Sequence, residues 1–249
     1  MARVARTSLK DIANELGVST ALVSFALNDV GKQHRVSEEM IRKIKAKAKE
    51  LDYRPNNAAR YLRSGRSYTI GVILSDISNR FFADIARCIE DEAYKKGFTV
   101  LFGSTDENAA KLKNTVKVFT NKGIDGVIIV PCEGSEATIR ELTDNGMPVV
   151  LIDRNFKELK VNSITLDNYR ATSLAVKELA GQGYTKIGYI SYKTSLENIL
   201  NREEGYKETM KVLGLERNTH IFIADYACIS ENLAKLISLT EKKTVQKIL

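Results

Sequence analysis

Hydrophobic residues in the first quarter of the chain recur with the period of short amphipathic helices. The pattern predicts a first helix over residues 9–16, with Ser8 as its N-terminal cap and Gly17 as the residue that ends it. Ser19 can cap a second helix over residues 20–27. Two short helices joined by a glycine-containing turn are typical of the helix-turn-helix unit, whose second helix has the size to enter a DNA major groove.

The outward side of the second predicted helix provides the candidate DNA contacts. Leu22, Val23 and Ala26 can point toward the core of this head. The outward positions, together with the two helix caps, are Ser8, Ser19, Thr20, Ala21, Ser24, Phe25 and Asn28. An exposed Phe25 would contact a thymine methyl group, whereas a shifted helix register would bury it in the core, and the sequence leaves both interpretations open.

A third amphipathic helix and a short hinge complete the head. The third helix is expected to begin after Ser37. His34, in the polar loop before it, could touch a phosphate, although a simply solvated side chain is the favoured interpretation. The segment after the third helix is expected to form about two helical turns. A helix of this length is too short to be stable without a partner or DNA. We therefore expect a helix-turn-helix domain over residues 1–55 and a hinge helix with its linker over residues 56–68.

From residue 69 onward, apolar runs of strand length alternate with amphipathic helical stretches. The expected elements are strand 69–75, helix 79–96, strand 98–102, helix 108–121, strand 126–130, helix 135–145, strand 149–152, helix 168–181, strand 186–191, helix 199–213, strand 221–225 and helix 230–239. Such alternation predicts a parallel sheet with helices on both faces. The expected fold class is an all-α helix-turn-helix head followed by an α/β body over residues 69–249.

The ends of the predicted strands provide the candidate ligand contacts, because ligands of open α/β sheets bind beyond the carboxyl ends of the strands. The residues at these places include Asp76, Phe81, Phe82, Asp153, Arg154, Asp167, Asn168 and Tyr192. Many residues at strand ends only cap the following helix, so a capping role is the alternative for each of them.

The distribution of charge separates the head from the body. Residues 1–66 carry 14 basic and 7 acidic side chains, which accounts for the whole net charge of +7 of the 249-residue chain. A basic head on a neutral body suggests that the head meets a polyanion such as nucleic acid. A merely solvated basic surface is the alternative.

Composition and motifs argue against several other classes of protein. No run of 18 apolar residues occurs, and the basic N-terminus lacks the apolar core of a signal peptide, so we expect a cytoplasmic protein without a membrane partner. Cys88, Cys132 and Cys228 lie too far apart for a zinc finger, and the odd number argues against a disulfide framework. Glycine-rich nucleotide loops and nucleophile elbows are absent, so neither a cofactor nor an enzyme activity is expected.

Motifs along the whole chain resemble those of the lactose-repressor/galactose-repressor family of bacterial transcription regulators. They are Ser8-Leu-Lys-Asp-Ile-Ala13, Gly17-Val-Ser19, Leu51-Asp-Tyr-Arg-Pro-Asn56, Asp76-Ile-Ser-Asn-Arg-Phe-Phe82, Pro148-Val-Val-Leu-Ile-Asp-Arg154 and Arg202-Glu-Glu-Gly-Tyr206. The resemblance implies a regulator, of the repressor type, whose affinity for operator DNA is controlled by a sugar or sugar derivative. It also implies a homodimer and a two-lobed body similar to a periplasmic binding protein.

The same resemblance assigns roles to individual residues. Asn56, Ala59 and Leu62 match the hinge helices that become ordered on operator DNA, and Leu62 matches the leucine that wedges into the minor groove. The resemblance favours Phe81, Arg154 and Arg202 as effector contacts, and Asp76, Phe82 and Asp167 from the strand ends complete the expected set. Two positions depart from the family pattern. Phe25 stands where many relatives carry an arginine that reads bases, and Arg80 stands where the family usually has a proline.

The resemblance also bears on the end of the sequence, and two other classes of function remain as alternatives. In the family, further strands and helices follow the position of Leu249, so we expect an incomplete second lobe that binds effector poorly, and a head that folds on its own. The alternatives are a DNA-architectural protein with an inert body and a sugar-processing enzyme domain fused to a DNA-binding head. A change in operator affinity caused by a small molecule separates the regulator from both.

Overall fold

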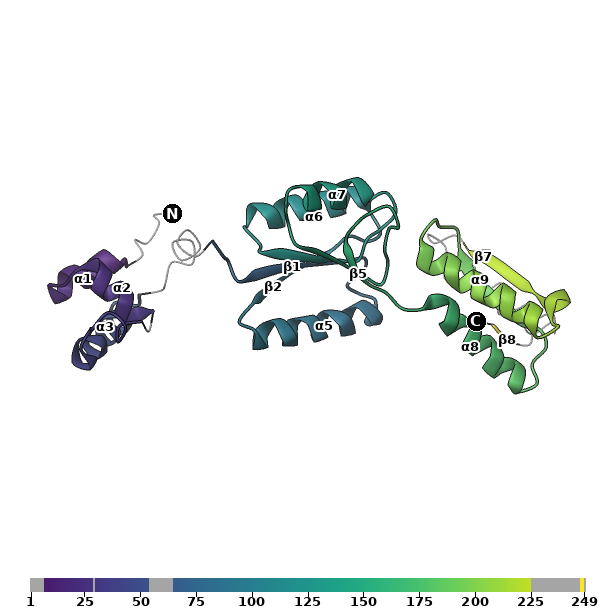
Figure 1. The fold of residues 1–249 in the computed structure, drawn as a ribbon, viewed down its shortest axis with the longest axis horizontal. Helices are drawn as coiled ribbons and strands as arrows, with labels where there is room; N and C mark the ends of the chain where they lie inside the picture. The colour runs from purple at the N-terminus through teal and green to yellow at the C-terminus, as the bar shows by residue number, and fades with distance from the viewer. Residues whose placement is uncertain (1–6, 29, 54–64, 225–246, 249) are drawn as a thin grey trace. The chain divides into compact units, whose positions relative to one another are not determined.

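The computed structural model describes residues 7–28, 30–53, 65–224 and 247–248. Residues 1–66 and residues 67–249 form two compact units (Figure 1). The boundary between the units falls inside the segment predicted to be a hinge and linker. The predicted hinge helix and the helix predicted over residues 230–239 lie outside the described residues.

The described residues of the N-terminal unit contain three helices: α1 (Leu9–Leu16), α2 (Thr20–Leu27) and α3 (Glu38–Glu50). Each begins at its predicted serine cap, whose hydroxyl accepts a hydrogen bond from a backbone N–H of the first turn. Ser8 and Asp11 form a reciprocal capping box, and Gly17 ends α1 in the left-handed conformation with φ of 64°. The predicted bounds of α1 and α2 are therefore confirmed.

The core of the N-terminal unit is small and apolar. Its buried residues are Ile12, Ala13, Val23, Ala26, Ile44 and Ala48. Ile41 packs partly against this core and lies so close to Gly31 that a Cβ on the glycine would be 2.8 Å from Ile41 Cδ1. The loop between α2 and α3 is therefore packed tightly against α3 at Gly31.

Five parallel strands form the first sheet of the C-terminal unit in the part of the chain that the structure describes. They are β1 (Thr69–Leu74), β2 (Thr99–Ser104), β3 (Gly126–Ile129), β4 (Val149–Ile152) and β5 (Asn162–Ile164), in the spatial order β2-β1-β3-β4-β5. Helix α5 (Arg80–Lys95) covers one face, and α6 (Ala109–Asn121) and α7 (Glu136–Asp144) cover the other (Figure 1). The predicted architecture is confirmed, and β5 is an addition that the sequence pattern did not indicate.

Both faces of this sheet are apolar. Its strands are runs of hydrophobic residues, and successive side chains along a strand point to opposite faces. In β1, Ile73 packs with the core on the side of α6 and α7, whereas Val72 and Leu74 pack with Phe82 of α5. Buried layers on both faces fix the register of the strands, since a shift of one residue would exchange the two sets of side chains. The carboxyl ends of the strands are thereby held at one edge of the sheet.

The second sheet of this unit contains, among the described residues, three parallel strands in the order β7-β6-β8. They are β6 (Ile187–Tyr192), β7 (His220–Ala224) and β8 (Lys247–Ile248), and a 3₁₀ helix over Glu216–Asn218 precedes β7. Helices α8 (Asn168–Gly181) and α9 (Glu197–Val212) pack against each other so closely that a Cβ on Gly205 would collide with the carbonyl oxygen of Tyr169. The Tyr206 hydroxyl of α9 donates to the carbonyl of Ile187 at 2.6 Å and accepts from the amide of His220 at 2.9 Å.

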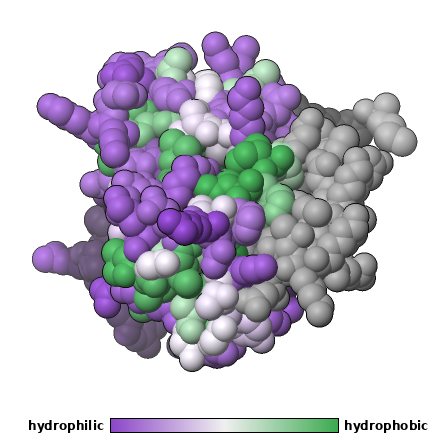
Figure 2. All heavy atoms as spheres, turned by 90° about the vertical axis from the view of Figure 1, so that its right-hand side faces the viewer, coloured by the Kyte–Doolittle hydropathy of each residue, from purple (hydrophilic) through white to green (hydrophobic). Residues whose placement is uncertain are grey.

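One face of the molecule can be followed by its hydropathy. On the face shown in Figure 2, hydrophobic side chains gather in small patches separated by hydrophilic residues. Within the described part of the chain, no helix is long and apolar enough to cross a membrane.

Candidate functional site

The outward face of α2 carries the predicted DNA contacts. Thr20, Ala21 and Asn28 are exposed, and Ser24 and Phe25 are half-buried. The Asn28 side-chain amide donates to the Ser24 carbonyl at 2.7 Å, so Asn28 also helps to end the helix. The face is accessible in its first turn, which is the part of a recognition helix that contacts bases. Asn56, Ala59 and Leu62, the predicted hinge contacts, lie outside the described residues.

Phe25 occupies neither of the two positions that the sequence left open. It does not belong to the packed core of the head, and it does not project freely into solvent. Its ring stacks on that of His34, with the ring centroids 3.7 Å apart and the planes 7° from parallel. The simply solvated His34 that the sequence favoured is therefore replaced by a histidine with a defined aromatic partner.

A polar pocket of about 340 Å³ lies at the carboxyl ends of strands from both sheets of the C-terminal unit. It is lined by Ser75, Asp76, Asn79, Phe81, Phe82, Glu107, Asp153, Arg154, Tyr192, Asn198, Ile199 and Arg202. Five of the six predicted effector contacts are thus brought together. The sixth, Asp167, accepts a hydrogen bond from the backbone N–H of Arg170 at the start of α8 and is not among the lining residues. Its assignment to the effector stays a prediction.

A larger hollow of about 540 Å³ lies along α5 and β2. Its lining includes the exposed side chains of Ile77, Tyr94 and Phe102. Converging polar groups are what give a small-molecule site its specificity, and the pocket at the strand ends holds them in far greater number. We therefore take the smaller, polar pocket as the candidate ligand site.

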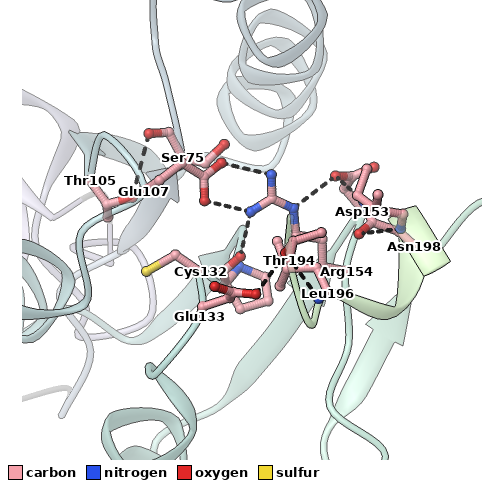
Figure 3. A network of polar contacts seen from close by, with 12 residues as sticks. Ser75, Thr105, Glu107, Cys132, Glu133, Asp153, Arg154, Thr194, Leu196 and Asn198 are labelled. Atoms are coloured by element: carbon pink, nitrogen blue, oxygen red, sulfur yellow. Dashed lines mark hydrogen bonds and ion pairs between the residues drawn. The ribbon is translucent and has the colours of Figure 1, made fainter. Parts of the chain in front are cut away.

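The centre of the pocket is an ion-paired arginine (Figure 3). The side chain of Arg154 is only 6% exposed, and its two terminal nitrogens donate to the two carboxylate oxygens of Glu107, each at 2.7 Å. Nη1 also donates to the carbonyl of Pro131 at 3.0 Å, and Nε lies 3.5 Å from Asp153 Oδ2. This paired geometry holds the guanidinium rigidly between two carboxylates.

Burial and nearby charge have opposite effects on the pKa of Asp153, the second carboxylate beside Arg154. Burial raises the pKa of Asp153, and the guanidinium groups of Arg154 and Arg202 oppose the rise. The side-chain amide of Asn198 donates to Asp153 Oδ2 at 3.4 Å. Arg202 is held from the other side, since its Nε donates to the side-chain oxygen of Asn168 at 2.7 Å. Both arginines are therefore oriented before any ligand arrives.

The aromatic residues of the pocket have different environments. Phe82 is buried in the core beneath α5, whereas Phe81 is 51% exposed, and the two rings meet edge to face with centroids 5.0 Å apart. Arg80 is the first residue of α5, where proline is favoured in helices generally, and its guanidinium lies 3.7 Å from Asp84 on the same helix. The departure at Arg80 therefore leaves the start of α5 intact.

A second polar contact connects the loops that follow β3 and precede α9 (Figure 3). One carboxylate oxygen of Glu133 accepts hydrogen bonds from the Thr194 hydroxyl at 2.7 Å, from the Ser195 hydroxyl at 2.8 Å and from the Ser195 amide. The backbone hydrogen bond from Ser195, followed by that from Thr194, lowers the pKa of Glu133. Glu133 stays ionised and holds the two loops together at neutral pH.

Sequence reasoning missed Glu107, Glu133 and Asn198. Glu107 and Glu133 follow β2 and β3, so the rule that ligands bind at the carboxyl ends of strands would have included them had it been applied to every strand. Asn198 lies in the first turn of α9 and carries no comparable signal. The pairing of Glu107 with Arg154 spans 47 residues, and no local pattern reveals it.

The described residues offer little for metal or thiol chemistry. Among them, no group of three or more histidine, cysteine or carboxylate side chains is arranged to hold a metal ion. Cys132 is buried, and burial raises the pKa of its thiol, which disfavours the reactive thiolate. Cys88 is exposed on α5, and Cys228 lies outside the described residues.

Two family models match the two units of the chain. Residues 8–56 match the model described as bacterial regulatory proteins, lacI family. Residues 67–234 match the model described as periplasmic binding proteins and sugar binding domain of LacI family. The first match covers α1 to α3, and the second covers the pocket and all of its lining residues.

Individual proteins show the same similarity. The chain is 33% identical over 207 residues to the probable HTH-type transcriptional regulator EndR of Paenibacillus polymyxa, which covers 82% of this chain and 60% of the relative. It is 32% identical over 243 residues to catabolite control protein A of Priestia megaterium, which covers 95% and 72%. The crystal structure of the lac repressor dimer bound to operator and the anti-inducer ONPF matches 96% of this chain and 72% of that chain, with a TM-score of 0.80 and 22% identity. The chain thus spans less than two thirds of the length of EndR.

Proposed function

The chain belongs to the LacI family of bacterial regulatory proteins, and from this premise we propose that it is a transcriptional repressor whose affinity for operator DNA changes when a sugar-like molecule binds. One observation carries the proposal. A capped helix-turn-helix head holds the whole net positive charge, and the same chain carries a polar pocket in a separate α/β unit. The head suits DNA phosphates, and the pocket suits a small molecule. A regulator of this kind acts on chromosomal DNA, so we place it in the cytoplasm.

In this proposal, the first turn of α2 reads operator bases. Thr20 and Ala21 are exposed there, and Phe25 lies further along the same helix. For the hinge, the proposal assigns Leu62 to the minor groove, where an apolar wedge between base steps kinks the duplex. Asn56 and Ala59 would contact DNA beside it. Leu62→Ala should then weaken operator binding without loosening the body.

The charges of the pocket favour a neutral polyhydroxyl ligand. Asp76, Glu107 and Asp153 place three carboxylates around it, against two guanidinium groups. Arg154 already donates to Glu107 and Pro131, so it has little capacity left to neutralise an anionic ligand. Hydroxyl groups donate to carboxylates and accept from arginine, whereas a phosphate group supplies mainly acceptors. A sugar without a phosphate or carboxylate group fits these partners best.

We also propose that the chain acts as a homodimer. Helix-turn-helix regulators bind two half-sites with two heads, and two-fold symmetry relates the heads. The exposed Tyr94 on α5 and Phe102 on β2 lie along the hollow described above and give this face an apolar character. Contiguous exposed apolar surface of this kind is typical of a protein interface.

Selection of binding sites from randomised duplex DNA by the full chain tests the DNA-binding part of the function. We expect one preferred sequence, and exchange of Thr20 and Ala21 for another pair should change its bases. Affinity should fall at least tenfold between about 50 and 200 mM salt, because lysine and arginine side chains release counterions from the phosphates. Equal affinity for selected and scrambled DNA, or affinity independent of salt, would contradict the proposal.

Titration with neutral sugars and their phosphate esters tests the ligand. D-ribose, D-glucose, D-galactose and sucrose are compared with glucose 6-phosphate and fructose 1-phosphate by calorimetry and by their effect on operator affinity. We expect the best neutral sugar to bind at least about tenfold more tightly than any ester. Glu107→Gln should shift this ratio toward the esters, whereas Glu208→Gln, the same charge change at an exposed position outside the pocket lining, should not. Tighter binding of esters by the wild-type chain, or no neutral ligand, would oppose the neutral class.

A further inference from the structure

Phe25 on α2 and His34 in the following loop form a parallel aromatic stack at the surface of the head. Their ring centroids lie 3.7 Å apart, and their planes are 7° from parallel. His34 is exposed, and the half-buried Phe25 stands apart from the side chains that pack the core of the head. The contact therefore contributes to the surface that carries α2 rather than to the interior beneath it.

The backbone of the loop holds His34 in position for this contact. The amide of Val30 donates to the carbonyl of Phe25 at 3.1 Å, which ties the start of the loop to α2. The amide of His34 donates to the carbonyl of Gly31 at 3.1 Å. Gly31 itself is buried against Ile41 of α3, where even a Cβ would not fit without a shift. The loop thus has a fixed course between the two helices, and His34 is presented on it.

The stack restricts the conformations of Phe25. An aromatic side chain on a helix surface can otherwise exchange between staggered rotamers. His34 covers one face of the Phe25 ring, and the part of this half-buried side chain that stays exposed is available to a partner. A side chain that is already ordered loses less entropy when it makes a contact, so the stack prepares Phe25 for recognition.

We propose that His34 is a positioning residue that holds the ring of Phe25 against a thymine methyl group in the major groove. This inference rests on the proposed function, because it requires α2 to face operator bases. The phenyl ring has no hydrogen-bonding group, and the methyl group of thymine is the apolar feature of the major groove that such a ring can read. The loop after α2 then takes part in the choice of operator bases without a base contact of its own.

The charged side chains of the same loop suggest a competing role for His34, which is contact with a DNA phosphate. Lys32 and Arg35 are exposed on either side of it, and Lys32 lies 3.0 Å from Glu38 of α3. Basic side chains there suit DNA phosphates, which a histidine could also contact. A phosphate contact strengthens binding to all sequences alike, whereas a positioning role acts on one base position. The two roles are therefore separable by measuring sequence preference.

Binding-site selection with the full chain and four variants tests the proposal. Phe25→Ala first locates the base position that Phe25 reads. His34→Ala should lower discrimination at that same position by roughly fivefold or more and leave the other positions unchanged. His34→Tyr, which keeps a ring able to stack, should retain most of the discrimination. Gln33→Ala, an exposed neighbour in the same loop, is the matched control and should leave the whole profile unchanged.

Three results would overturn the inference. The first is an even loss of affinity over all sequences in His34→Ala, with a weaker salt dependence, which would indicate a phosphate contact. The second is a lower melting temperature and weaker binding in His34→Ala without any change in base preference, which would indicate a structural role. The third is a base profile that Phe25→Ala does not alter. By contrast, a wild-type chain without any preferred sequence would contradict the proposed function itself.

Discussion

Replacing Arg154 with methionine is expected to lower the free energy of unfolding of the C-terminal unit by about 3–5 kcal/mol. The side chain is 6% exposed and lies between the carboxylates of Glu107 and Asp153. Methionine fills a similar volume but leaves Glu107 without its paired cation and Asp153 with only the more distant Arg202, both in a desolvated site. Urea unfolding followed by circular dichroism measures the change.

The double variant Arg154→Met with Glu107→Gln provides the control for this prediction. It removes the Glu107 carboxylate, which the single variant leaves buried without its cation, so it should recover a large part of the lost stability. With the Glu107→Gln single variant added, the double-mutant cycle reports the coupling of the pair separately from the loss of packing. A single variant within about 1 kcal/mol of the wild-type chain would show that the Arg154–Glu107 pair does not hold the loops of the pocket together.

The second large effect is expected from Gly205→Ala, which should destabilise the packing of α8 on α9 by about 1–3 kcal/mol or more. The added methyl group would collide with the carbonyl oxygen of Tyr169, and a backbone atom cannot rotate away as a flexible side chain can. The two helices must separate, and the core around Tyr206 and Met210 opens with them. Thermal unfolding measures the loss.

Gly181→Ala is the matched control, because Gly181 is also a helical glycine of this pair of helices. A Cβ there meets no atom within 4 Å, so the substitution should change stability by less than about 1 kcal/mol. Equal melting temperatures for the Gly205→Ala and Gly181→Ala chains would show that α8 and α9 tolerate a wider separation than the structure indicates.

Much of the fold was predictable because its signals are local. The serines at positions 8, 19 and 37 each stand directly before an apolar helical pattern, and the helices begin there. The buried strands of the first sheet are short apolar runs, which their burial on both faces requires. Strand β5 was missed because Asn162–Ile164 is short and its residues are exposed, so it carries no apolar signal.

The candidate site was predictable only in part, because its contacts join distant segments. The ends of strands correctly pointed to Asp76, Phe81 and Arg154 as neighbours in space. The partner of Arg154 could not be deduced, since Glu107 is 47 residues away in a loop without periodicity. In the head, the helical period left open whether Phe25 lies outside the core, and the His34 ring that covers it comes from a loop whose course depends on packing at Gly31.

The contact between Phe25 and His34 also has an evolutionary consequence. A helix residue that reads a base is free to change by itself only if nothing else on the protein depends on its shape. Here the ring at position 25 rests on a ring at position 34, so a change of shape at either position alters the surroundings of the other. If position 25 reads a base as we propose, a lineage that moves to a new operator through this position must also release or replace position 34. Substitutions at the two positions would then be inherited as a pair, and an operator read through this pair would drift more slowly than one read by an isolated side chain.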